Sequence, residues 1–292
     1  MDWTPTLPQL PWPSFGPTLV DLLTAAGNKL DREWPAKWVN EGKAAFLLPS
    51  LARTVENTFH TIKVLSADKP TPPITREDAL SVGPLARTIL DSLFLIIFLF
   101  DDLPGRATWY FKGGWREMWE EQQMLLATYG GDANWKEWLD LRQKILDEWV
   151  TRLGLSATEA ADPTKHLRYW PTPGRMIRDG NTSPQRIALM KYLDEWYYGD
   201  LSSESHLSLP GLVMRSMALD RDQDQRIRDW RLDKQRSDNM LRATVLATAF
   251  VSEIDIECRY GFADRLKYVW GVLAGYFNLA KDLYDRWYAS RL

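Results

Sequence analysis

Helical periodicity is the feature of this 292-residue chain that most limits its fold. Apolar residues recur at spacings of three and four along most of the sequence, which gathers them on one face of an α-helix. Sustained alternation of apolar and polar residues is absent, and no Asn-Gly or Asp-Gly turn joins two apolar runs. The sequence therefore predicts an all-α fold, a multi-helix bundle of roughly eight to ten helices.

Prolines and glycines divide this predicted bundle. Residues 1–17 hold five prolines, which predicts a proline-rich N-terminal arm. We expect residues 1–74 to form this arm and helices that pack on the core, and residues 75–292 to form the main helical domain, with one continuous domain as the alternative. The longer helices are expected at about 18–33, 51–65 (N-capped by Ser50), 114–129, 133–153, 238–259 and 262–290.

The composition is that of an ordinary globular protein. Hydrophobic residues make up 45% and charged residues 26%, and the net charge of -3 gives no broad attraction to nucleic acid or anionic membranes. The single cysteine, Cys258, excludes an intrachain disulfide and a cysteine zinc cluster. The N-terminal residues lack the pattern of a secretory signal, and the apolar run Leu93–Phe100 is shorter than the roughly 20 residues of a membrane helix. We expect a cytoplasmic protein that does not bind a membrane.

A first polar motif opens the most apolar segment. Arg87 and Asp91 are four residues apart, so they share a helix face. Asp91 precedes the apolar run, and we expect core to surround most of its helix and Arg87 to be its partner. The pair is either a structural ion pair or an acid positioned to orient a histidine or bind a substrate.

A second motif lies in the segment LDEWYYGDLSSESHLSLPG. Tyr198, Ser202 and His206 recur at intervals of four residues and therefore line one stripe of a helix, with Ser203 beside them. Such a stripe offers a general base, or an acid if the imidazole is protonated, next to two hydroxyl groups. The alternative is structural, because a histidine at a helix C-terminus also bonds the last carbonyl groups.

Together the two motifs resemble an uncharacterised, mainly bacterial helical family known as domain of unknown function 5677. The resemblance rests on Arg87 and Asp91, then Tyr198, Leu201, Ser202, Ser203 and His206, and covers roughly residues 76–220. The family usually has Glu in place of Asp91 and often Pro in place of Leu207. It implies a shared polar site inside a helical bundle, formed here by Arg87, Asp91, Tyr198, Ser202 and His206, without an established activity.

A more distant analogy is to helical ribonucleases of the HEPN type, in which an Arg and a His cleave RNA without a metal. Their usual spacing occurs once here, from Arg53 to His60, which is the frequency that chance predicts. The analogy requires instead that Arg87 and His206 meet across two helices. If the chain is an enzyme, it is then a metal-independent, ribonuclease-like hydrolase, and we expect neither a cofactor nor a metal ion.

The irregular segment suggests where RNA would bind. It interleaves basic and aromatic side chains, which together contact phosphates and stack on bases. These residues are Lys165, His166, Arg168, Tyr169, Trp170, Arg175 and Arg178. A solvated loop is the alternative, because the net charge indicates no wider basic surface.

Fifteen tryptophans are many for this length. Trp115 and Trp119, and likewise Trp135, Trp138 and Trp149, recur at helical spacing, which predicts core-facing stripes. The alternative is an exposed surface that stacks on a ligand or contacts a protein partner.

Two hypotheses of function follow. The first is an RNA-directed effector in stress or phage defence whose polar pocket is built from both motifs. The second is a non-enzymatic interaction or regulatory module in which the polar cluster only locks helix register, with a partner bound by the tryptophan-rich surface or the N-terminal arm. The sequence fixes neither the substrate nor the oligomeric state.

Overall fold

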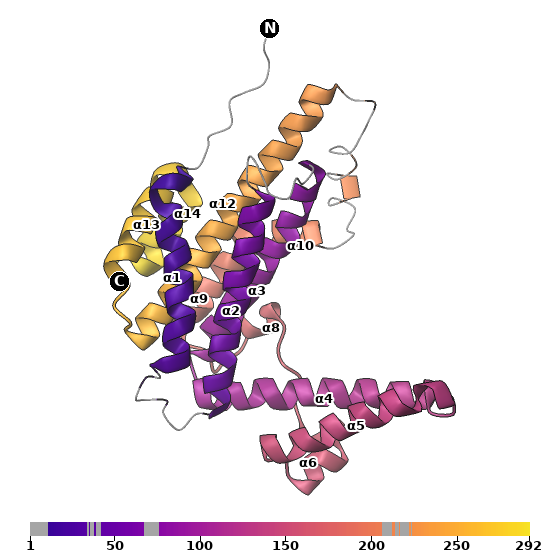
Figure 1. Ribbon diagram of the computed structural model, residues 1–292. Coiled ribbons are helices and arrows are strands. Elements are labelled where there is room, and N and C mark those ends of the chain that lie inside the picture. Colours follow the sequence, from indigo (N-terminus) through magenta and orange to yellow (C-terminus); the bar gives the residue numbers. More distant parts are fainter. Residues whose placement is uncertain are drawn as a thin grey trace.

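The computed structural model describes residues 11–33, 35, 38, 42–66, 76–205, 212, 213, 216, 222 and 224–292. Within these residues every regular element is a helix, and nine α-helices have seven residues or more. The prediction of an all-α fold is confirmed. The helices form an upright bundle from which one long hairpin projects sideways (Figure 1).

The centre of the bundle is α3 (Val82–Leu99), in which 14 of 18 residues are buried. It packs against α2 (Gly42–Leu65), α12 (Gln225–Cys258) and α10 (Gly199–Ser205). The outer helices α1 (Trp12–Arg32) and α13 (Ala263–Tyr276) pack against α12 and each other. One hydrophobic core therefore runs from Phe15 in α1 to Tyr288 near the C-terminus.

The central helix α3 is also long and apolar enough to be compared with a membrane-spanning helix. By length and composition Val82–Leu99 could cross a bilayer, yet 78% of this segment is buried inside the protein. A mostly buried core helix of a globular bundle has the same composition.

The hairpin consists of α4 (Leu103–Tyr129) and α5 (Ala133–Leu153). Figure 1 shows α4 crossing the lower end of the bundle and continuing away from it, with α5 returning alongside. Trp115 in α4 donates from Nε1 to the carbonyl of Leu146 at 3.1 Å, and Gln122 donates from Nε2 to the carbonyl of Leu139 at 3.1 Å. These bonds hold the two helices in register.

Short helices return the chain from the hairpin to the bundle. They are α6 (Ala157–Ala161), α7 (Pro163–His166) and α8 (Pro173–Met176). The segment between α7 and α8 crosses α4 at Gly113, where a side chain would have no room. Leu167 from this segment joins Trp115, Leu146 and Leu153 in a second, smaller core.

The last part of the bundle contains two wide turns. The helix α9 (Pro184–Leu193) continues through the π-helical turn η3 (Asp194–Tyr198) into α10. Near the C-terminus, α14 (Asn278–Leu283) leads into a second π-helical turn, η4 (Tyr284–Tyr288). A short 3-10 helix, η2 (Arg76–Ser81), precedes α3.

Five predicted helix boundaries are wrong. The N-terminal arm was expected to reach residue 17, but α1 begins at Trp12, because proline fits the first turn of a helix and Phe15 and Leu19 are buried there. Ser50 is not an N-cap: it lies inside α2 and donates to the carbonyl of Phe46. The helix expected from residue 114 begins at Leu103, capped by Asp102.

The helix expected at 238–259 begins earlier, at Gln225, because the charged segment before it continues the helix. The single helix expected at 262–290 is interrupted at Phe277, whose backbone is extended, so α13 and α14 are separate. Residues 1–10 and 67–75, with the rest of the N-terminal arm and the boundary expected near 74, lie outside the described residues.

Gly113 and Gly114 form a matched pair that tests the crossing over α4. A Cβ on Gly113 would lie 2.9 Å from the backbone nitrogen of Trp170 and 3.0 Å from the carbonyl oxygen of Arg168, whereas a Cβ on Gly114 meets nothing within 4 Å. We expect Gly113→Ala to lower the free energy of unfolding by about 1–3 kcal/mol through overpacking. Gly114→Ala should raise it by up to about 1 kcal/mol, because alanine is the better helix former. Urea unfolding followed by tryptophan fluorescence measures both, and equal effects would contradict the crossing.

Candidate functional site

The first motif forms a compact cluster around Arg87. Its Nε lies 3.0 Å from each carboxylate oxygen of Asp91, and its Nη1 donates to the carbonyl of Tyr198 at 3.3 Å. The guanidinium carbon lies 3.3 Å from the centre of the Tyr198 ring, a cation–π contact. Arg87 is 9% exposed, so these contacts join α3 to the end of η3 in a largely buried position.

The π-helical turn brings Tyr198 to this place. Turns of this kind are rare and often occur at functional sites. The Tyr198 ring also makes an edge contact with Phe94, with ring centres 6.1 Å apart. Tyr197, next to it, is fully buried, and burial raises the pKa of its hydroxyl well above the usual value.

The side chain of Asp91 is more exposed than the sequence predicts. The apolar run suggested a carboxylate surrounded by core, but its side chain is 49% exposed. Asp91 and Thr88 are the exposed residues of α3, so they share one face of that helix. The buried partner of the pair is the arginine.

The second motif is only partly within the described residues. Ser202 is half-buried in α10, which packs against α3, and its side chain makes no hydrogen bond within the described part of the chain. Ser203 donates to the carbonyl of Asp200 at 2.7 Å. His206 lies outside the described residues, so the expected meeting of Arg87 and His206 stays a prediction.

Glu204 lies beside this motif and has several partners. It accepts hydrogen bonds from Asn239 Nδ2 at 2.6 Å and Gln235 Nε2 at 3.2 Å, both in α12. A Cβ on Gly83 would collide with the Glu204 side chain, so α10 closely approaches the start of α3. These contacts fix α10 between α3 and α12.

The predicted RNA-binding residues are divided between surface and core. Trp170 is half-buried and packs against Phe98, Trp109 and Tyr110, so its ring supports the fold. Lys165 is exposed and paired with Asp162 at 2.7 Å. Among the predicted RNA-binding residues, Arg168, Arg175 and Arg178 are exposed and have no ion pair within the described part of the chain.

A larger polar network was not recognised in the sequence. We call it the arginine–carboxylate network, and it consists of Asp101, Arg106, Asp179, Arg186, Glu253, Glu257 and Arg291. At its centre Glu253 is completely buried, 3.1 Å from Arg291 Nη1 and 3.5 Å from Arg186 Nη1. Arg186 also contacts Glu257 at 2.5 Å.

The network continues to the corner between α3 and α4. Asp101 lies 3.5 Å from Arg186 and 3.4 Å from Arg106. Arg106 donates to the carbonyl of Phe98 at 2.5 Å and to Thr182 Oγ1 at 3.0 Å. Burial lowers the pKa of Arg106, while the carboxylates of Asp101 and Asp179 act in the opposite direction. A guanidinium group keeps its charge under such a shift, so its buried charge must be balanced by these partners.

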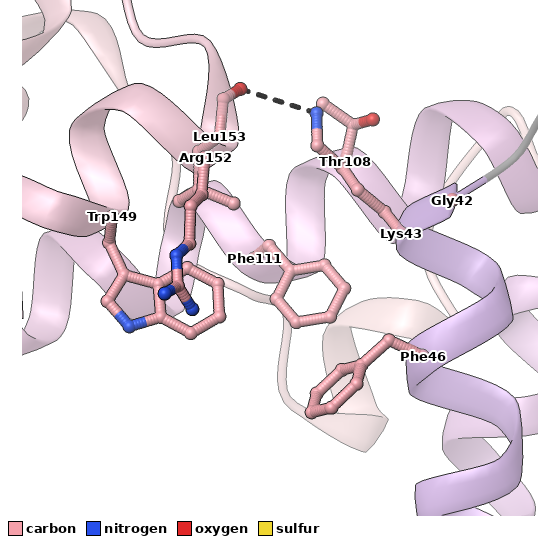
Figure 2. A pocket seen from close by; sticks show the side chains of 8 residues that line it. All are labelled: Gly42, Lys43, Phe46, Thr108, Phe111, Trp149, Arg152 and Leu153. Carbon is pink, nitrogen blue, oxygen red and sulfur yellow. Dashed lines mark hydrogen bonds between the residues drawn. The ribbon is translucent and has the colours of Figure 1, made fainter.

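A groove lies where the hairpin leaves the bundle. It is open to solvent, has a volume of about 450 Å³ and is lined by Gly42, Lys43, Phe46, Thr108, Phe111, Trp149, Arg152 and Leu153. Figure 2 shows the Phe111 ring between Trp149 and Phe46, and Lys43 bonded across the groove to the carbonyl of Leu153 at 3.3 Å. The groove contains none of the predicted site residues.

Two of the hairpin tryptophans are more exposed than the sequence predicts. Trp115 is buried as expected, but Trp135 is 37% and Trp138 is 40% exposed. Near the tip, Trp135 stacks on Tyr129 with ring centres 4.5 Å apart. A two-helix hairpin has too few layers to bury both stripes, so the second stripe remains at the surface.

Comparison with known proteins adds no family to these observations. No protein-family model, curated protein or solved structure matches this chain. Within the described residues, no group of three His, Cys, Asp or Glu side chains has the geometry of a metal site.

Substitutions of Glu253 and Asp91 test which of the two ion-paired carboxylates contributes more to the stability of the fold. We expect Glu253→Gln to lower the free energy of unfolding by about 3 kcal/mol, because two partly buried guanidinium groups lose the fully buried carboxylate that they share. Asp91→Asn should cost less than about 1 kcal/mol, because the carboxylate is half exposed. Urea unfolding measures both values, and a larger cost for Asp91→Asn would contradict this ranking.

Proposed function

We propose that this chain is a non-catalytic protein-interaction module whose bundle holds the α4–α5 hairpin out as the partner-binding part. One observation carries the proposal. Of the sixteen large hydrophobic side chains that are exposed among the described residues, eight lie between Met118 and Ile145, in about a tenth of the chain. Concentrated apolar surface on a projecting element is typical of a protein-binding site.

The first motif supports the same proposal. Two of the three guanidinium nitrogens of Arg87, Nε and Nη1, are bound to Asp91 and Tyr198, and the ring of Tyr198 covers the guanidinium plane. These contacts are what a structural lock between two helices requires. The polar cluster therefore supports the structural role better than the catalytic one.

Two variants of the hairpin test the proposal. Leu141 is 56% and Ile145 is 38% exposed, so replacing both with serine leaves the core intact. We expect Leu141→Ser/Ile145→Ser to lose the partner that co-purifies with the tagged wild-type protein from its native cells, with an unchanged thermal melt. The matched control is Met124→Ser, because Met124 is 60% exposed on the hairpin but lies off that stripe.

The partner is identified by quantitative mass spectrometry of the three samples. A protein that is depleted at least ten-fold by the double substitution and kept by the control supports the interaction module. The same set of proteins in all three samples, or none enriched over an untagged lysate, would contradict it.

An RNA-directed effector, acting in stress or phage defence, is the second candidate. It is favoured by the exposed guanidinium groups of Arg168, Arg175 and Arg178, whose charges have no acidic partner within the described residues. Free basic side chains in an irregular segment suit phosphate groups.

Binding and cleavage of RNA are tested together, in the presence of EDTA. If this candidate is right, a labelled single-stranded RNA binds the wild type at least ten-fold more tightly than the variant Arg168→Ser/Arg175→Ser/Arg178→Ser, and Arg265→Ser behaves as wild type. Cleavage that is lost in His206→Ala with an unchanged thermal melt would make the protein a metal-independent ribonuclease. Absence of both binding and cleavage would rule this candidate out.

A further inference from the structure

One face of the hairpin carries two apolar stripes that meet at the groove. In α4, Phe111, Met118 and Leu125 are spaced by seven residues, and in α5, Trp138, Leu141, Ile145 and Trp149 follow helical spacing. We call these seven residues the open face. Phe111 and Trp149 stack with ring centres 6.3 Å apart and an angle of 17°, so the stripes converge there (Figure 2).

The opposite face of the hairpin is already covered. Leu155 and Ala160, before and within α6, and Leu167, just after α7, pack with Trp115 and Leu146 in the second core. Within the part of the chain that the structure describes, the outer part of the open face has no such cover, and there Met118 is 40% and Leu141 is 56% exposed. The hairpin is therefore packed on one side and lacks a layer on the other.

The charges around the open face are mostly negative. Glu117 and Glu121 flank Met118 in α4, and Glu137 and Glu148 lie one turn before and two turns after Leu141 in α5. Glu117 and Glu137 have no ion pair within the described residues. The basic residues here are Lys144 and Arg142, and Arg142 pairs with Glu121 at 2.7 Å and lies over the Trp138 ring. Four carboxylates against two cations leave the face with an excess of negative charge.

The groove end of the open face has the opposite charge. Two of the residues that line the groove are the cations Lys43 and Arg152, and none of the lining residues is acidic. Arg152 is 65% exposed and its contact with Glu148 is long, at 3.9 Å. The whole surface is thus an apolar strip that is acidic along the hairpin and basic at the bundle.

We propose that the open face and the groove bind one amphipathic helix of a partner protein. This inference rests on the proposed interaction module and specifies the chemistry of its partner. The helix has an apolar stripe flanked by Lys and Arg over the hairpin, and a carboxylate at the end that enters the groove between Lys43 and Arg152. One large apolar side chain of the helix fills the groove against Phe46, Phe111 and Trp149.

The dimensions fit such a helix. The segment from Trp138 to Arg152 extends over about 21 Å, which is the length of a helix of about four turns. A partner helix with apolar residues at positions i, i+3 or i+4, i+7 and i+11 would contact the open face along its whole length.

A second copy of the chain fits less well. In a two-fold symmetric pair the same face meets itself, so the glutamates of one hairpin would oppose those of the other. Like charges placed across an interface are unfavourable. Charge complementarity therefore selects a basic amphipathic helix.

Two synthetic peptides test the charge pattern. Both are labelled 16-residue helices with the same leucine stripe; the first has lysines beside the stripe and two glutamates at one end, and the second has every lysine and glutamate exchanged. Fluorescence anisotropy with the full-length protein gives their affinities. We expect the first peptide to bind at least ten-fold more tightly than the second, and added salt to weaken it.

Variants of the protein locate the bound peptide. We expect Ile145→Glu to weaken the first peptide at least ten-fold, although the new carboxylate attracts lysine, because the apolar contact is lost. In the matched control Met124→Glu, the affinity for the first peptide should stay within about two-fold of the wild-type value, since Met124 does not belong to the open face. The double variant Lys43→Glu/Arg152→Glu should weaken the first peptide and improve the binding of a version without its terminal glutamates.

Each outcome decides the proposal. Preference for the first peptide with loss in Ile145→Glu supports it. Equal binding of both peptides, equal effects of Ile145→Glu and Met124→Glu, or no binding at all would overturn the partner chemistry while leaving the interaction module to its own test. A dimer in light scattering that Ile145→Glu dissociates would overturn it too, because the occupant would then be a second copy.

Discussion

The buried carboxylate of Glu253 is the interaction on which the rest of the architecture depends. It pairs with Arg186 and Arg291, and Arg186 in turn contacts Asp101, which contacts Arg106. This chain of charges joins the C-terminus, α9 and α12 to the corner where α3 ends and α4 begins. Burying any of these charges without its partners would cost free energy, so the junction of α3 and α4 has one favourable arrangement.

The direction of the hairpin follows from that corner. Arg106 lies in the first turn of α4 and is bound to Phe98, Asp179 and Thr182, so the start of the helix cannot rotate freely. Farther out, α4 and α5 pack mainly against each other and the small second core. The start of α4 is therefore rigid, and the outer part of the hairpin is packed on one side only. This arrangement leaves apolar side chains of the hairpin accessible to a partner. The proposed function depends on this geometry rather than on the first motif.

Much of the fold could be predicted from the sequence because helical periodicity is a local signal. The helix α5 has the expected bounds, and the expected helices near 259 and 262 end and begin on either side of Gly261, whose φ of 81° favours glycine. The exposed position of Asp91 could not be predicted, because only the packing of α2, α10 and α12 on α3 decides which face stays open. The arginine–carboxylate network could not be predicted for the same reason: Asp101, Arg186 and Glu253 are far apart in sequence and meet only in the folded chain.

We infer that the corner between α3 and α4 holds the hairpin in one direction, with its open face free. Double electron–electron resonance between spin labels at Thr54 in the bundle and Lys136 on the hairpin, with Cys258→Ser to remove the native thiol, tests this most directly, because both sites are exposed. We predict a single narrow distance distribution that broadens in Glu253→Gln at a temperature where that variant is still folded. A broad distribution in the wild-type protein would contradict the account.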